Sequence, residues 1–414
     1  AQSAIFKNAY APAPYTLPSH VSLFTSLYPT VHGIQDKSAG TIPPEACLLA
    51  ERLAGEGWIT GSFNGGGYVS HDFGFHRGFD LYCEVDPLGD QYLNGYVMHK
   101  EQVFADGTAG SFSRALSWLE TMKDQRFFLF LHTFMIHDFQ PPNRYADEYA
   151  RHLPPALKPG KKLFDSIKGR YHNTGKVTDD ERKYIVNMYD GGIKASDDMI
   201  GALLAHIHGL GIEEETVVIL LSDHGEEFLD HGELNHNRTL YEEMIRVPLI
   251  IRIPGRRAGS VSESQVSLVD VVPTVLDLLG IRYDERSCGG RSLQGLIEGA
   301  AIKDPIVYAE VDVPEFSKRS CVIEDRWKYI EGSTEAALKH PAPAATQLFD
   351  LRTDPHEKQD LSETDPEKRE RLEKLLEAEK ENRLRKRKAM KIDNQVSLPL
   401  DPELLEMLKQ QGYL

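Results

Sequence analysis

The sequence predicts an α/β fold, a mostly parallel doubly wound sheet followed by a small antiparallel sheet and a helix. Strand-like and helix-like segments alternate through the first 300 residues, which is typical of a sheet with helices on both faces. Residues 127–134 (FFLFLHTF) and 217–221 (VVILL) are apolar runs, which favours strands buried on both faces. After about Gly299 short strands separated by turns are expected at residues 306–310, 320–323 and 327–330.

Turn and capping residues mark the predicted helices. These helices lie at residues 43–57, 111–122, 178–208 and 269–279. The third opens with the capping pattern Thr178-Asp179-Asp180-Glu181. The stretch 144–177 is expected to be a solvated loop rimming a cleft. We predict two domains, an α/β domain at residues 1–300 and a C-terminal α+β subdomain at residues 301–414, in which residues 367–390 form a densely charged, solvated helix.

Composition excludes several classes of protein. Hydrophobic residues make up 41% and charged residues 27%, as in soluble globular proteins. A formal charge of −16 argues against a nucleic-acid partner but leaves room for an anionic small substrate. No apolar run approaches the ~20 residues that span a bilayer. No signal peptide is visible either, so we expect a cytoplasmic protein if the chain is complete. The four scattered cysteines are expected to be mostly buried thiols. Oligomeric state is left open.

The predicted strand at residues 217–221 ends in Ser222-Asp223-His224-Gly225. Ligands bind at the carboxyl edge of open α/β sheets, where this strand would deliver an oxygen and a nitrogen donor suited to a divalent cation. Gly225 lets the chain turn sharply afterwards. A solvated polar turn after a strand would use the same residues, so other segments must decide between the two interpretations.

The second informative segment is Tyr15-Thr16-Leu17-Pro18-Ser19-His20. Pro18 is placed where a helix could begin, so Thr16 would lie near free backbone N–H groups that favour an anion. A hydroxyl at this position most often serves as an N-cap. His20, four residues after Thr16, could contact an anion or lie on the helix surface.

Together these segments resemble the sulfatase family of the alkaline phosphatase superfamily. The resemblance runs in family order over almost the whole chain. It is carried by FKNAY at 6–10, TLPSHVSLFTSLYPTVHG at 16–33, GGGY at 65–68, FGF at 73–75, GFD at 78–80, FLH at 130–132 with His137 and PP at 141–142, MYDG at 188–191, SDHGEEFLDHGELNHNRTLYEEMIRVPLIIRIPG at 222–255, LFDL at 348–351 and TDP at 353–355.

The resemblance implies a metal-dependent ester hydrolase or transferase in residues 1–300. It places Thr16 as the nucleophile and as a metal ligand, beside the metal ligands Asp223 and His224. His137 and His236 match histidines that contact the transferred anionic group or protonate the leaving group, and His20 is a further candidate for substrate binding. One divalent ion per site is implied, with zinc, manganese, magnesium and calcium all compatible. The substrate would be an anionic small molecule or a lipid or glycan ester.

Two departures from the family pattern qualify the expected reaction. Sulfatases carry Cys or Ser at the nucleophile position and convert it to formylglycine, whereas Thr16 cannot be converted in that way. We therefore expect chemistry on phosphate esters, with a sulfuric ester hydrolase (arylsulfatase-like) as the alternative. The family's first strand, with its acidic metal ligands, should precede Phe6 and is missing from this sequence. A non-catalytic or truncated family member is therefore the second alternative.

Overall fold

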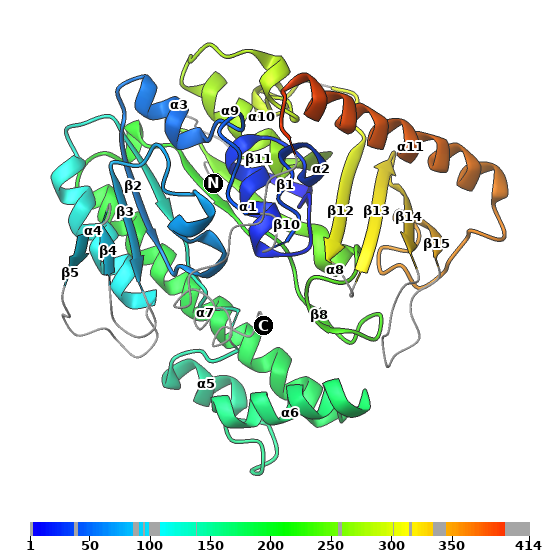
Figure 1. Cartoon of the computed structure of the whole chain (residues 1–414). Coiled ribbons are helices and arrows are strands. Elements are labelled where there is room, and N and C mark those ends of the chain that lie inside the picture. The colour runs from blue at the N-terminus through cyan, green and yellow to red at the C-terminus, as the bar shows by residue number, and fades with distance from the viewer. Residues whose placement is uncertain are drawn as a thin grey trace. The chain divides into compact units, whose positions relative to one another are not determined.

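The computed structural model describes residues 3–36, 40–85, 91–93, 96–98, 108–137, 139–255, 259–300, 302–313, 317–333 and 345–393 (Figure 1). The chain forms two compact units. The first contains Ala1–Leu49, Val217–Glu227 and Asn235–Pro399, and the second contains Ala50–Thr216, Phe228–Leu234 and Leu400–Leu414. The predicted domain division at residue 300 stays a prediction.

The first unit is built on a four-stranded sheet of order β11-β1-β10-β7. Its strands are β1 (Ser3–Tyr10), β7 (Val218–Leu221), β10 (Arg246–Arg252) and β11 (Ser260–Ser267). Strand β1 is parallel to β11 and antiparallel to β10, which in turn is antiparallel to β7. Phe6, Leu249 and Ile251 lie in one apolar core with residues of α9 (Val271–Leu278) and α10 (Gln294–Ile297).

Helix α1 (Thr16–Thr25) follows β1 and is buried along its whole length. It ends at Ser26, whose hydroxyl donates to the Val269 carbonyl at 2.6 Å. The short α2 (Pro29–His32) comes next and carries a fully buried histidine. The backbone N–H of Ile34 donates to Nδ1 of His32, and burial lowers the pKa of this histidine to about 3. His32 is therefore a neutral structural residue.

The predicted C-terminal antiparallel sheet is confirmed. It is a meander of β12 (Val307–Val313), β13 (Ser317–Glu324), β14 (Trp327–Ser333) and β15 (Thr346–Asp350). Helix α11 (Pro366–Ala389) contacts β13 and β14 of this sheet (Figure 1). The predicted charged helix at residues 367–390 is present, but it is not solvated throughout, because Leu372, Leu376 and Arg383 are buried. The Arg383 guanidinium stacks between the rings of Tyr28 and Tyr308, 4.1 and 3.7 Å from their centroids.

A buried charge cluster joins β14 to the short helix α8 (Glu242–Ile245). Lys328 is fully buried, and its Nζ lies 3.2 Å from Glu242 and 2.8 Å from Glu357. Buried charges are tolerated when they are paired and hydrogen-bonded. The cluster therefore anchors α8, whose carbonyl groups hold the site described below.

The second unit has a five-stranded sheet of order β5-β4-β3-β2-β6, with β2 parallel to both β3 and β6. Its strands are β2 (Ile59–Asn64), β3 (Leu81–Val85), β4 (Gln91–Leu93), β5 (Tyr96–Met98) and β6 (Phe127–Leu131). Its helices are α4 (Thr108–Met122), α5 (Asn143–Ala150), α6 (Lys161–Thr174) and α7 (Asp179–Gly209), and α3 (Leu49–Gly55) begins at the unit boundary. The predicted capping box of α7 between Thr178 and Glu181 is confirmed.

The described residues also contain single-turn 3-10 helices. They lie at Gly67–Val69, His71–Phe73, Glu213–Glu215, Leu268–Asp270 and Glu285–Ser287. No helix in the described ranges is long and apolar enough to cross a membrane.

The predicted α/β class is confirmed, with sheets that mix parallel and antiparallel pairs. Three local predictions are wrong. The helix predicted at residues 43–57 begins only at Leu49. The stretch at 144–177 is not a solvated loop, since α5 and α6 bury Ala146, Phe164 and Tyr171 against α7. Strands β6 and β7 are not fully buried, because each lies at one end of its described sheet with mostly half-buried residues.

Candidate active site

Thr16 is the first residue of α1, and only 2% of its surface is exposed. The N-cap position belongs to Tyr15, which makes no side-chain capping hydrogen bond. The interpretation of Thr16 as a simple N-cap is therefore wrong. The Ala11 N–H donates to the Ile245 carbonyl at 2.7 Å, which fixes the loop between β1 and α1 against the end of α8.

The turn after β7 presents Asp223 and His224, and Gly225 allows it to pack against α8. The N–H groups of Gly225 and Glu226 donate to the carbonyls of Met244 and Glu243, at 2.8 and 3.0 Å. A Cβ on Gly225 would lie 1.9 Å from the Glu243 carbonyl oxygen, so a residue with a side chain cannot occupy this position without movement. The Ser19 hydroxyl of α1 donates to the Asp223 carbonyl at 2.6 Å.

Three side chains converge where α1 meets this turn. Thr16 Oγ1 lies 3.3 Å from His224 Nε2, which is 3.5 Å from Asp223 Oδ2. His224 Nδ1 lies 2.7 Å from the Gly225 carbonyl and donates its proton to that oxygen. The Nε2 lone pair is thereby directed at the hydroxyl and the carboxylate. The predicted metal ligands thus lie together, although their role stays a prediction.

His20 lies one turn further along α1 and is 2% exposed, so the alternative of a surface histidine is wrong. Its Nδ1 lies 3.0 Å from the Thr16 carbonyl and 3.3 Å from Asp223 Oδ2. The geometry makes His20 a direct neighbour of Asp223. Its predicted role in binding substrate is not tested by these contacts.

His236 reaches the same place from the hairpin of β8 (Glu227–Phe228) and β9 (Leu234–Asn235). Its ring centroid lies 4.6 Å from that of His224. The following residue, Asn237, donates its N–H to the Pro14 carbonyl at 3.1 Å, two residues before Thr16. Glu226 Oε2 lies 3.2 Å from His236 Nδ1, and this carboxylate was not among the predicted site residues. Sequence reasoning could not single out Glu226, because the burial of His236, which calls for an acceptor of its ring N–H, is a property of the fold.

His137 belongs to the second unit, where it ends the turn after β6. Its N–H donates to the Phe134 carbonyl at 2.9 Å, and its half-buried ring meets the Phe134 ring edge-on at 5.5 Å. Gly192 of α7 lies close to this turn, since a Cβ there would come within 3.0 Å of the Met135 carbonyl oxygen. The catalytic role of His137 stays a prediction.

Comparison with family models identifies the family. The Sulfatase model matches residues 1–281, more than half of the chain. The chain belongs to the sulfatase family. A second model, N-sulphoglucosamine sulphohydrolase, C-terminal, matches residues 230–386 of this sulfatase-family chain.

Among relatives, mouse arylsulfatase K is 32% identical over 203 residues, which cover 47% of this chain and 35% of that protein. The multifunctional alkaline phosphatase superfamily protein PehA of Trinickia caryophylli is 32% identical over 196 residues, covering 42% of this chain and 35% of PehA. The chain thus matches about a third of the length of these two relatives. A solved protein in complex with its substrate D-glucosamine-2-N,6-O-disulfate superposes with a TM-score of 0.74 at 18% identity, covering 94% of this chain and 91% of that one, which shows the fold.

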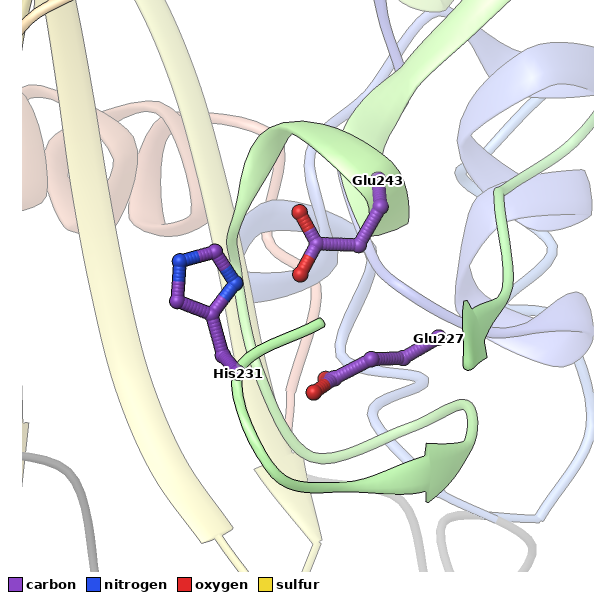
Figure 2. A group of neighbouring side chains, drawn as sticks. All are labelled: Glu227, His231 and Glu243. Atoms are coloured by element: carbon purple, nitrogen blue, oxygen red, sulfur yellow. The ribbon is translucent and has the colours of Figure 1, made fainter. Parts of the chain in front are cut away.

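Sulfatases generally bind a divalent metal, and the Asp223–His224 pair fits such an ion. A carboxylate oxygen and an imidazole lone pair face each other across 3.5 Å, an arrangement that a cation between them would satisfy. A separate acidic and histidine group lies nearby in the sequence: Glu227, His231 and Glu243 bring one potential ligand atom each within 4.8 Å of one another (Figure 2). Such groups also occur on protein surfaces without an ion, so we attach no function to this one.

Proposed function

We propose that this sulfatase-family chain hydrolyses sulfate monoesters with Thr16 as the nucleophile. The observation that carries the proposal is the convergence of the Thr16 hydroxyl, His224 and Asp223 at the start of α1, in a chain matched by the Sulfatase model over residues 1–281. Relatives named arylsulfatase K support sulfate over the phosphate esters expected from Thr16 alone.

A sulfated sugar is the substrate class that we favour. The structural neighbour holding D-glucosamine-2-N,6-O-disulfate supports this choice, because that protein shares the fold over 94% of this chain. Two buried histidines lie next to the Thr16 cluster and could contact the sulfate group of the substrate. They are His20 and His236, which are 2% and 6% exposed. An imidazole can contact an anion or donate a proton near neutral pH.

In the proposed reaction, Thr16 Oγ1 bonds to sulfur while the bond from sulfur to the alcohol oxygen breaks. The hydroxyl proton is released to solvent, and the departing oxygen takes a proton from His236. The oxygen of a water molecule then bonds to sulfur as the bond from sulfur to Thr16 Oγ1 breaks. One proton of that water restores the Thr16 hydroxyl, the other returns to His236, and sulfate is released. Asp223 and His224, with Thr16, would hold the divalent ion, which when bound lowers the pKa of the hydroxyl and neutralises charge on the sulfate oxygens.

Hydrolysis of phosphate monoesters is the second candidate. The observation that favours it is Thr16 itself, since a threonine cannot form formylglycine and must react through its hydroxyl. The match to PehA, described as a multifunctional alkaline phosphatase superfamily protein, also supports activity beyond sulfate.

Paired assays with aryl sulfate and aryl phosphate on the metal-supplied protein test both candidates. We expect the sulfate ester to have the higher kcat/KM, and Thr16→Ala to lower it by ~10³-fold or more because the nucleophile is removed. Thr25→Ala is the matched control, because Thr25 is buried in the same helix and donates to the Val21 carbonyl. A higher kcat/KM for the phosphate ester would support the second candidate, and full activity of Thr16→Ala would refute both.

A further inference from the structure

Glu226 and His236 form a buried pair beside the proposed nucleophile. Their side chains are 5% and 4% exposed, and His236 Nδ1 lies 3.2 and 3.4 Å from the two oxygens of the Glu226 carboxylate. A carboxylate is costly to bury without partners, and the His236 ring supplies a hydrogen-bond donor for this one. The pair also contacts the Thr16 cluster, through the 4.6 Å separation of the His236 and His224 rings.

The backbone on both sides of His236 adopts an unusual conformation. Asn235 and Asn237 have φ angles of 92° and 77°, in the left-handed region that few residues other than glycine adopt. Such a conformation persists where the surroundings determine it. The hydrogen bond from Asn237 N–H to the Pro14 carbonyl is one such determinant, since it fastens the segment to the loop before Thr16. The main chain thus sets the position of His236 and leaves the rotation of its ring to be fixed by a side chain.

We propose that Glu226 is the positioning residue that fixes the imidazole of His236 for the reaction at Thr16. Its carboxylate accepts the Nδ1 proton, which selects the ring orientation and directs Nε2 at the bound ester, where a second proton on Nε2 is the one given to the departing oxygen. This inference rests on the proposed ester hydrolysis, in which His236 contacts or protonates the substrate. Acceptors of this kind orient metal-ligating histidines, where their loss typically costs 10–100-fold in metal affinity or activity, and we expect a similar cost for His236.

Three variants separate positioning from simple structural support. Glu226→Met removes the acceptor at similar size, and we expect kcat to fall about 10–100-fold with KM changed by less than about threefold. Glu226→Gln retains an oxygen that can accept the Nδ1 proton and should recover most of the loss. The double variant Glu226→Met with His236→Gln should be no slower than His236→Gln alone, because both changes act through one imidazole.

Glu310→Gln is the control for loss of a buried carboxylate. The Glu310 carboxylate accepts hydrogen bonds from the N–H and the hydroxyl of Thr30. Only the backbone N–H of Glu310 reaches the loop before Thr16, at the Pro12 carbonyl, and Glu310→Gln leaves that bond in place, so this variant should lose stability but keep kcat/KM. Wild-type kcat in Glu226→Met, or independent losses in the double variant, would overturn the positioning role.

A spectroscopic readout separates this inference from the proposed function. In the ¹⁵N-histidine NMR spectrum of the full chain, the His236 signals, assigned by their loss in His236→Gln, should show a protonated Nδ1. Glu226→Met should abolish this preference, whereas Glu226→Gln should preserve it. An Nε2-protonated neutral ring in the wild type would overturn the inference even if esters are hydrolysed. If no ester is hydrolysed while Nδ1 is protonated, the proposed function fails and with it the positioning role for that reaction.

Discussion

Substitution of Gly225 by alanine tests how tightly the Asp223–His224 turn packs against α8. The added Cβ would lie 1.9 Å from the Glu243 carbonyl oxygen, and real Cβ atoms essentially never approach closer than 3.0 Å. The turn and α8 must therefore separate by about 1.1 Å, which stretches the 3.0 Å hydrogen bond from Glu226 N–H to that carbonyl beyond hydrogen-bonding distance.

The expected cost combines two contributions. Forced overpacking costs about 1–3 kcal/mol, and the loss of a backbone hydrogen bond costs about 1 kcal/mol more. We therefore expect Gly225→Ala to lower the free energy of unfolding by about 2–4 kcal/mol. Because Asp223 and His224 move with the turn, kcat/KM for the ester should fall as well.

Urea denaturation followed by circular dichroism measures this effect, with Gly201→Ala as the matched control. Gly201 lies in α7, and a Cβ there would meet nothing within 4 Å. The same substitution should therefore stabilise this helix by about 0.5–1 kcal/mol. A Gly225→Ala protein within about 0.5 kcal/mol of wild type would refute the argument that the Glu243 carbonyl constrains this turn.

Three further changes test the packing of the first unit. Arg383→Met should lower the free energy of unfolding in urea by about 2–4 kcal/mol, because it removes the two desolvated cation–π contacts with Tyr28 and Tyr308. An unchanged unfolding midpoint would contradict the importance of these contacts. Lys328→Met should lower the free energy of unfolding by about 3–5 kcal/mol, because Glu242 and Glu357 lose their buried cation, and Glu357→Gln in the same chain should recover part of that loss. Burial raises the pKa of Asp270 from 3.8 to about 6, so the folded state binds its proton more tightly than the unfolded state. The stability that this group contributes is therefore present below about pH 4 and is lost as pH rises through about 6, by up to about 3 kcal/mol. Asp270→Asn should flatten this pH dependence of the free energy of unfolding, measured by urea denaturation across the same range.

Local patterns predicted the elements that depend on neighbouring residues. The capping box of α7 needs only Thr178 and Glu181, which are three residues apart, and the structure forms it. The antiparallel sheet at β12–β14 follows in the same way from short apolar strands separated by turns. The Asp223–His224 pair could also be located from sequence, because a polar pair directly after an apolar strand has a defined place at the sheet edge.

Predictions failed where a residue is buried by a distant part of the chain. Helix α11 is so highly charged that its sequence indicates a solvated helix, yet Arg383 is buried between aromatic rings from α2's N-cap and β12. His20 is likewise indistinguishable from a surface histidine until α1 packs beside the turn after β7. Segments that lie far apart in sequence create both environments, so no local pattern reports them.

The motifs supply the candidate side chains of the site, but main-chain hydrogen bonds set their separations. Thr16 is placed by the hydrogen bond from Ala11 N–H to Ile245, and the segment after His236 is tied to Pro14. The turn carrying Asp223 is held by carbonyls at Glu243 and Met244. These partners are main-chain atoms whose side-chain identity matters little, so they leave no readable signal in the sequence. Displacement of α8 should therefore disturb the Thr16–His224 distance without any change in the side chains that would perform the chemistry.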